Sequence, residues 1–183
     1  AAALSFGLWR LGEPPPRAEA KVAIMQPAIE QPLKWDDRYT AMTLDVYFGL
    51  TRQVGREAAD LVVWPETAAP TVLRKDPGLL RALATLAEAL DTPLLVGSVD
   101  IEDGRPPRLR NTAFLLTERG LAGRYDKMHL VPFGEYVPLS EVIGFVRGWA
   151  EFISEMEAGA DPVVFPGPPA PFGVVICYEG IFP

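Results

Sequence analysis

The sequence predicts an α/β fold, in which short apolar strands alternate with amphipathic helices. Short runs rich in Val, Ile and Leu end at proline or at a charged residue, a pattern typical of buried strands. Between the first two of these runs, apolar residues recur at spacings of three and four, which indicates a helix with one buried face. Strand, helix and strand in succession favour a sheet covered by helices.

Composition limits the classes of function. A chain of 183 residues with 49% hydrophobic residues is large enough for one domain with its own core. The net charge of −7 argues against nucleic-acid binding, which needs a basic face. One cysteine excludes an intrachain disulfide, and one cysteine with one histidine does not supply a zinc site without several carboxylates. We therefore expect no metal.

The first half of the domain is expected to begin with a strand over residues 21–26, ended by Pro27. A helix follows over residues 39–54, and Asp36 or Asp37 lies near its N-terminus. Its apolar stripe is interpreted as core packing.

A second strand over residues 61–64 is expected to end at Pro65, and residues 67–70 are expected to form a loop. Asp76 and Pro77 then have the pattern of a helix N-cap followed by a proline in the first turn. The helix should run over residues 78–90 and bury one row of leucines: Leu79, Leu83, Leu86 and Leu90.

Two hairpins are expected in the second half. Residues 94–99 and 110–117 form the first, joined by a polar tip over residues 102–108. Residues 161–165 and 172–177 form the second.

The N-terminal segment over residues 1–11 is apolar and aromatic, with Phe6, Leu8 and Trp9. It fits either a frayed terminal helix or the end of a membrane helix, which needs roughly 20 apolar residues to span a bilayer. Residues 13–17 form a stiff, Pro-rich linker.

Cys177 follows the apolar run over residues 174–176, which is predicted to be a buried strand. By itself a single cysteine on such a strand fits a small core residue. The end of a central strand is also where ligands bind in open α/β sheets, so Cys177 is a candidate nucleophile.

Two further stretches favour the nucleophile over the core residue. Glu66 follows the strand over residues 61–64, and Lys127 and Glu135 lie in a segment punctuated by prolines and a glycine. Each alone fits a surface or loop-fixing residue. Together with the Cys177 thiol they form a nucleophile set, in which a carboxylate takes the thiol proton and an ammonium stabilises the oxyanion.

For two other features, the residues alone do not distinguish a packing role from a functional role. Trp35 fits a half-buried loop anchor. Residues 142–156 carry Phe145, Trp149 and Phe152 and fit either a core flap or a membrane-facing lid, since aromatic side chains favour the bilayer interface.

Three ordered motifs resemble a known family. They are VVWPE (62–66), RYDKMHLVPFGEYVP (124–138) and VVICYE (174–179), and they resemble the Glu–Lys–Cys motifs of the nitrilase, or carbon–nitrogen hydrolase, superfamily. The form of the second and third motifs, and of QPLKWD (31–36), is similar to the apolipoprotein N-acyltransferases within it.

The resemblance implies an α-β-β-α sandwich that is incomplete at its C-terminus. Residues 1–20 would be the end of a membrane segment with a Pro-rich linker, and residues 21–183 the catalytic domain through the nucleophile. The roles it implies form one set: Glu66, Lys127 and Cys177 catalytic, Glu135, Tyr178 and Glu179 supporting, Trp35 substrate-gating, and His129 packing or hydrogen bonding within its loop instead of pairing with the cysteine.

The resemblance also implies a function and a location. The acyl chain of a phospholipid would pass through a cysteine thioester to the N-terminal amine of a lipid-modified apolipoprotein, without a cofactor. The enzyme would lie in the bacterial inner membrane with this domain on the periplasmic side. A soluble amidase or nitrilase with the same three residues, and an inactive interaction module, are the alternatives.

Overall fold

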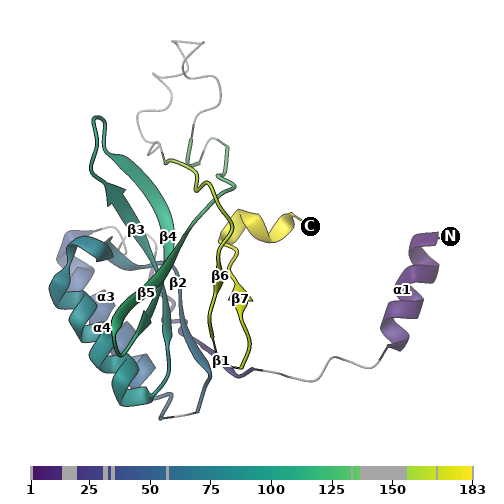
Figure 1. Cartoon of the computed structure of the whole chain (residues 1–183), viewed down its shortest axis with the longest axis horizontal. Helices are drawn as coiled ribbons and strands as arrows, with labels where there is room; N and C mark the ends of the chain where they lie inside the picture. Colours follow the sequence, from purple (N-terminus) through teal and green to yellow (C-terminus); the bar gives the residue numbers. More distant parts are fainter. Residues whose placement is uncertain are drawn as a thin grey trace.

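The computed structural model of the chain describes residues 2–13, 20–30, 33, 36–56, 58–132, 134–136, 156–167 and 169–182 (Figure 1). Its helices are α1 (Ala2–Gly12), α3 (Thr40–Arg52) and α4 (Pro77–Leu90), with short 3-10 turns η1 (Asp37–Tyr39), η2 (Leu73–Lys75) and η4 (Cys177–Ile181). Its strands are β1 (Val22–Ile24), β2 (Leu61–Val72), β3 (Leu94–Glu102), β4 (Arg108–Thr117), β5 (Gly120–Asp126), β6 (Val164–Phe165) and β7 (Phe172–Gly173).

A five-stranded sheet in the order β1-β2-β3-β4-β5 forms the centre of the molecule. Strands β1, β2 and β3 are parallel, because α3 and α4 return the chain between them, and β4 and β5 are antiparallel neighbours. Helices α3 and α4 cover one face, and the two-stranded sheet β6–β7 lies on the other side (Figure 1). The α/β prediction is confirmed, as is the hairpin of β3 with β4.

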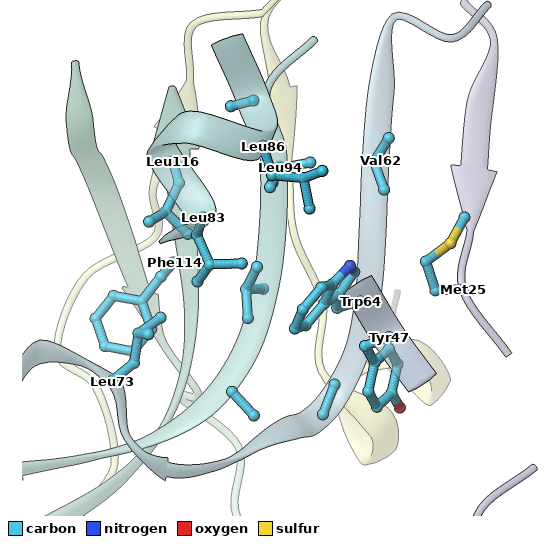
Figure 2. Close-up of a cluster of buried hydrophobic side chains, with 14 of the residues drawn as sticks. Met25, Tyr47, Val62, Trp64, Leu73, Leu83, Leu86, Leu94, Phe114 and Leu116 are labelled. Atoms are coloured by element: carbon cyan, nitrogen blue, oxygen red, sulfur yellow. The ribbon is translucent and has the colours of Figure 1, made fainter. Parts of the chain in front are cut away.

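The main hydrophobic core fills the space between the sheet and the two helices (Figure 2). Trp64 of β2 stacks on Tyr47 of α3 with ring centroids 4.8 Å apart, and its indole Nε1 donates to Thr51 Oγ1 at 2.8 Å. The four predicted leucines of α4 are all buried. Asp76 caps this helix as predicted, since its carboxylate accepts from the backbone N–H of Leu79 at 2.9 Å.

A second, smaller core lies on the opposite face and joins the sheet to the C-terminal segment. Leu115 and Tyr125 of the sheet pack there with Phe165 of β6 and with Ile176. This core brings the segment that carries Cys177 against the face of the sheet that α3 and α4 leave uncovered.

The prediction that the second strand ends at Pro65 is wrong. Strand β2 continues to Val72, and its later part pairs with β3 through Ala69 and Ser98 after a shift in register. The Ser98 hydroxyl donates to the carbonyl of Thr71 at 2.6 Å, which holds this part of β2 in the sheet. The expected loop over residues 67–70 is therefore strand, and Pro65 lies at an irregularity within it.

The prediction that Cys177 ends a buried central strand is also wrong. The second hairpin forms as β6 with β7, but β7 stops at Gly173 and belongs to the separate two-stranded sheet. Val175 is 68% exposed, and the N–H of Ile176 donates to the Glu179 carboxylate at 2.8 Å. Because that N–H is bound by a side chain, the segment approaches the sheet as an extended loop.

Two further elements complete the described fold. Strand β5 was not predicted, because its sequence GLAGRYD contains no run of large apolar residues. Helix α1 lies apart from the sheet, and none of its residues is buried (Figure 1). Within the described part of the chain, no helix is long and apolar enough to cross a membrane.

Candidate active site

Glu66 is positioned by the irregularity in β2 and by a close approach to β3. A Cβ atom at Gly97 would lie 2.3 Å from the Pro65 carbonyl oxygen and 2.8 Å from the Glu66 Cα, so only glycine allows these backbones to meet. The next residue, Thr67, has a φ of 49°, which is unusual for a β-branched residue and marks local strain. At this irregularity of β2, the carboxylate of Glu66 faces Asn111, whose Nδ2 donates to its Oε1 at 2.5 Å.

Lys127 is held at the end of β5 by its own backbone. Its N–H donates to the Asn111 carbonyl at 2.8 Å, and its carbonyl accepts from Gly159 N–H at 2.8 Å. Its side chain is fully buried between two carboxylates: Nζ lies 2.7 Å from Glu135 Oε1 and 3.6 Å from Glu66 Oε1. A buried ammonium needs such partners, because burial without them is strongly unfavourable.

Glu135 is fixed as well as paired. Its second oxygen, Oε2, accepts from the Val131 backbone N–H at 2.9 Å, so the carboxylate is anchored on the loop while Oε1 faces Lys127. The three side chains Glu135, Lys127 and Glu66 therefore form a continuous row.

Cys177 begins the turn η4 and is exposed. Its φ of 50° is in the left-handed region, which costs energy for a residue other than glycine. The short turn thus presents the thiol at the surface of the second core.

Glu179 holds this turn against the sheet. Its carboxylate is buried and accepts four hydrogen bonds: from the Tyr125 hydroxyl at 2.6 Å and from the N–H groups of Ile176, Met128 and His129 at 2.8, 2.7 and 3.1 Å. Burial alone raises the pKa of Glu179, but these donors outweigh it and hold the pKa below its ordinary value. Burial, and then the bond to Glu179, raise the pKa of Tyr125, which remains a donor.

A cavity of about 160 Å³ joins the thiol to the carboxylate. Cys177 and Glu66 both line it, together with Asn111 and Gly97. A second cavity of about 590 Å³ has Tyr178, the next residue, in its lining. Both cavities are lined largely by apolar side chains, and Glu66 and Asn111 bring polar groups into the smaller one.

His129 lies on the second cavity. Its ring stacks on Phe182 with centroids 4.5 Å apart, and Tyr178 contacts the edge of the same Phe182 ring at 5.3 Å. The imidazole thus packs within this aromatic group.

The structure brings together residues that the sequence places far apart, and adds two that the prediction missed. Asn111 bonds Glu66, and Tyr125 bonds Glu179. Asn111 lies between Arg110 and Thr112 in the polar first half of β4, so the local sequence does not distinguish it from its neighbours. Trp35 and the aromatic residues Phe145, Trp149 and Phe152 lie outside the described residues.

The arrangement supplies what nucleophilic catalysis needs: a thiol, a carboxylate on the same cavity, and a buried ammonium beside that carboxylate. Among residues with described placement, no group of three or more His, Cys, Asp or Glu side chains forms a metal site.

Comparisons with known proteins find relatives along the whole chain. Relatives named apolipoprotein N-acyltransferase from Geobacter metallireducens and Sinorhizobium fredii are each 38% identical, over 98% and 100% of this chain. The chain spans 35% and 37% of their lengths.

Two solved structures share the fold. A CN-hydrolase superfamily protein from Xanthomonas campestris superposes with a TM-score of 0.63 at 20% identity, over 90% of this chain and 55% of the other. An amidase from Nesterenkonia sp., with acrylamide added at its active-site cysteine, gives a TM-score of 0.56 at 17% identity, over 86% and 57% of the two chains.

The model of the carbon–nitrogen hydrolase family matches residues 21–183, which include the sheet, the Glu66–Lys127–Glu135 row and the Cys177 turn. The chain therefore belongs to the carbon–nitrogen hydrolase family.

Proposed function

We propose that this chain carries the catalytic centre of an apolipoprotein N-acyltransferase, with Cys177 as nucleophile, Glu66 as general base and Lys127 as oxyanion stabiliser. The observation that carries the proposal is the row Glu135–Lys127–Glu66, whose last member lines one cavity with the Cys177 thiol. The names of the relatives from Geobacter metallireducens and Sinorhizobium fredii support the acyl-transfer chemistry.

In the first half-reaction, the Cys177 sulfur attacks the ester carbonyl carbon of a phospholipid while Glu66 accepts the thiol proton. Lys127 and the backbone N–H of Tyr178 stabilise the oxyanion of the tetrahedral intermediate. The C–O bond to the glycerol then breaks, and the proton held by Glu66 passes to the leaving oxygen. Lysophospholipid departs, and an acyl thioester remains on Cys177.

In the second half-reaction, the α-amine of a lipid-modified N-terminal cysteine attacks the thioester carbon. A C–N bond forms, the C–S bond breaks, and Glu66 carries the amine proton to the departing thiolate. The products are an N-acylated apolipoprotein and the free Cys177 thiol. Every step uses side chains of this chain and the two substrates, without a cofactor.

The supporting residues have positioning roles in this scheme. Glu135 balances the buried Lys127 charge and orients its ammonium, and Glu179 fixes the turn that carries Cys177. Tyr178 borders the apolar cavity of about 590 Å³, which suits an acyl chain next to the reacting carbonyl.

The same proposal places the enzyme at the periplasmic side of a bacterial inner membrane. Residues 1–20 would lead from the membrane into the domain that begins at residue 21. The support is α1, whose exposed side chains Phe6 and Trp9 belong to a type enriched at bilayer interfaces. Trp35 would gate the substrate, as its match to the QPLKWD motif implies.

The test is the Cys177→Ser variant of the complete protein encoded by the gene. After incubation with phospholipid, mass spectrometry should find an acyl adduct on the parent and none on the variant, since a serine hydroxyl ionises far less readily than a thiol. An adduct of equal yield on the serine variant would remove Cys177 from the nucleophile role. A parent that reacts with short amides but not with phospholipid would favour an amidase instead.

A further inference from the structure

We propose that Asn111 is a positioning residue for the Glu66 carboxylate, an inference that rests on the proposed function. Asn111 lies on β4, on the face of the sheet that carries the second core, and its side chain lines the cavity shared by Cys177 and Glu66. It is 2% exposed.

Asn111 connects both charged members of the site. Its side-chain Nδ2 donates to Glu66 Oε1 at 2.5 Å, and its backbone carbonyl accepts from the Lys127 N–H at 2.8 Å. The Oε1 atom that Asn111 holds is also the atom that lies 3.6 Å from Lys127 Nζ. One residue therefore fixes the backbone of the lysine and one oxygen of the carboxylate that faces it.

Glu66 needs such a restraint because of where it lies. It lies in an irregular part of β2, and its side chain is 34% exposed, so burial alone does not select one rotamer. A general base acts only when its oxygen lies within hydrogen-bond reach of the proton that it accepts. A neutral N–H donor holds the carboxylate in place and leaves its negative charge intact.

Packing alone does not explain why residue 111 is an asparagine, because burying its carboxamide costs free energy. Its Oδ1 is buried and has no hydrogen-bond partner among the described residues. An apolar side chain of similar size would avoid this loss, as Ala113 and Leu115 do further along the same face of β4. What the carboxamide adds is the donor to Glu66.

Thr112 offers a matched control one residue away. It is fully buried and its hydroxyl donates to a carboxylate, Asp126 Oδ1, at 2.7 Å, but it faces the opposite side of the sheet. Asn111→Leu and Thr112→Val therefore each remove one buried donor to a carboxylate, and only the first touches the site. The Lys127 N–H bond to the residue 111 carbonyl is retained in both.

The experiment measures acylation of Cys177 in the complete protein, with phospholipid and with the water-soluble ester p-nitrophenyl butyrate. For Asn111→Leu, the rate at saturating ester should fall about 100-fold, the loss expected when a reacting group is displaced by about 1 Å. The half-saturating ester concentration should stay unchanged, because Asn111 orients the base and does not bind the ester. Thr112→Val should keep the parent rate.

Two results would overturn the inference. One is an Asn111→Leu enzyme that acylates as fast as Thr112→Val. The other is an equal loss of rate and melting temperature in both variants, which would make Asn111 a structural residue only. If the parent accepts an acyl group from the ester but not from phospholipid, the proposed function fails, and the comparison of the two variants with the ester still decides the role of Asn111.

Discussion

At the scale of single residues, the site depends on a glycine that carries no chemistry. Gly97 lets the backbone of β3 approach Pro65 and Glu66 more closely than any side chain would allow. The position of the Glu66 carboxylate therefore depends partly on the absence of a side chain at Gly97 of the neighbouring strand β3.

We predict that Gly97→Ala displaces Glu66 and slows acylation of Cys177. The added methyl would lie 2.3 Å from a backbone oxygen, and relieving that overlap should cost about 1–3 kcal/mol of stability. Shifting the base by about 1 Å should lower the acylation rate on the order of 100-fold. Single-turnover mass spectrometry and urea unfolding measure the two effects.

Gly49→Ala is the matched control for this substitution. A Cβ at Gly49 meets nothing within 4 Å, and the residue lies within α3. Alanine there should leave acylation unchanged and stabilise the helix by about 0.5–1 kcal/mol. A Gly97→Ala enzyme with parental rates would show that Glu66 does not need this close approach.

At the scale of elements, Glu179 connects the turn that carries Cys177 to β5. Its carboxylate in η4 accepts from Tyr125 of β5 and from two N–H groups just beyond that strand. Because these donors lower the pKa of Glu179, its ionised form contributes stability above the pKa it has in the unfolded chain. That contribution is lost as the pH falls through the lower folded-state pKa.

We predict that Tyr125→Phe makes the attachment of the turn more sensitive to acid. The variant removes one of the donors that lower the pKa of Glu179, so this pKa rises towards its ordinary value. The ionised Glu179 then stabilises the folded protein over a narrower range of pH. Near neutral pH, losing a hydrogen bond to a charged group should cost about 1.5–3 kcal/mol.

Tryptophan fluorescence followed from pH 7 downwards checks this prediction, and the midpoint of acid unfolding should lie at higher pH in Tyr125→Phe. Tyr39→Phe is the control, since Tyr39 precedes α3 on another part of the chain. Identical acid midpoints for Tyr125→Phe and the parent would mean that the Tyr125 bond does not contribute to the state of Glu179.

At the scale of the whole molecule, α1 carries more exposed large apolar side chains than any other element that the structure describes. Five of its large side chains are at least 60% exposed: Leu4, Phe6, Leu8, Trp9 and Leu11. A helix with this much exposed apolar surface is unfavourable in water and favourable at a lipid interface.

We predict that this 183-residue chain floats with vesicles of bacterial phospholipids and that the double variant Phe6→Ser, Trp9→Ser does not. Burying each of these side chains is worth about 1.5–3 kcal/mol, so removing both should weaken partitioning on the order of 100-fold or more. The control replaces two exposed apolar residues of the sheets, Leu121 and Val164, with serine. If both double variants floated equally well, vesicle binding would not depend on the aromatic side chains of α1.

The sequence by itself determined the α/β class, the helices α3 and α4 and the chemical types at the site. Apolar periodicity predicted α4 and its leucines, and Asp76 followed by Pro77 predicted its cap, because both signals act over a few neighbouring residues. The motifs around Glu66, Lys127 and Cys177 predicted the residues of the site, and their roles remain proposals.

Only the tertiary structure decided how those residues meet. Strand β5 and the second half of β2 form through pairing with β4 and β3, a long-range effect that no local pattern in those segments shows. The Cys177 segment, which looks like a central strand, is instead an extended loop, because the Glu179 carboxylate binds the Ile176 N–H that a strand would use. The contacts of Asn111 with Glu66 and of Tyr125 with Glu179 join residues 45 and 54 positions apart. The first exists only once β2 and β4 lie in one sheet, and the second only once the Cys177 turn has packed against that sheet.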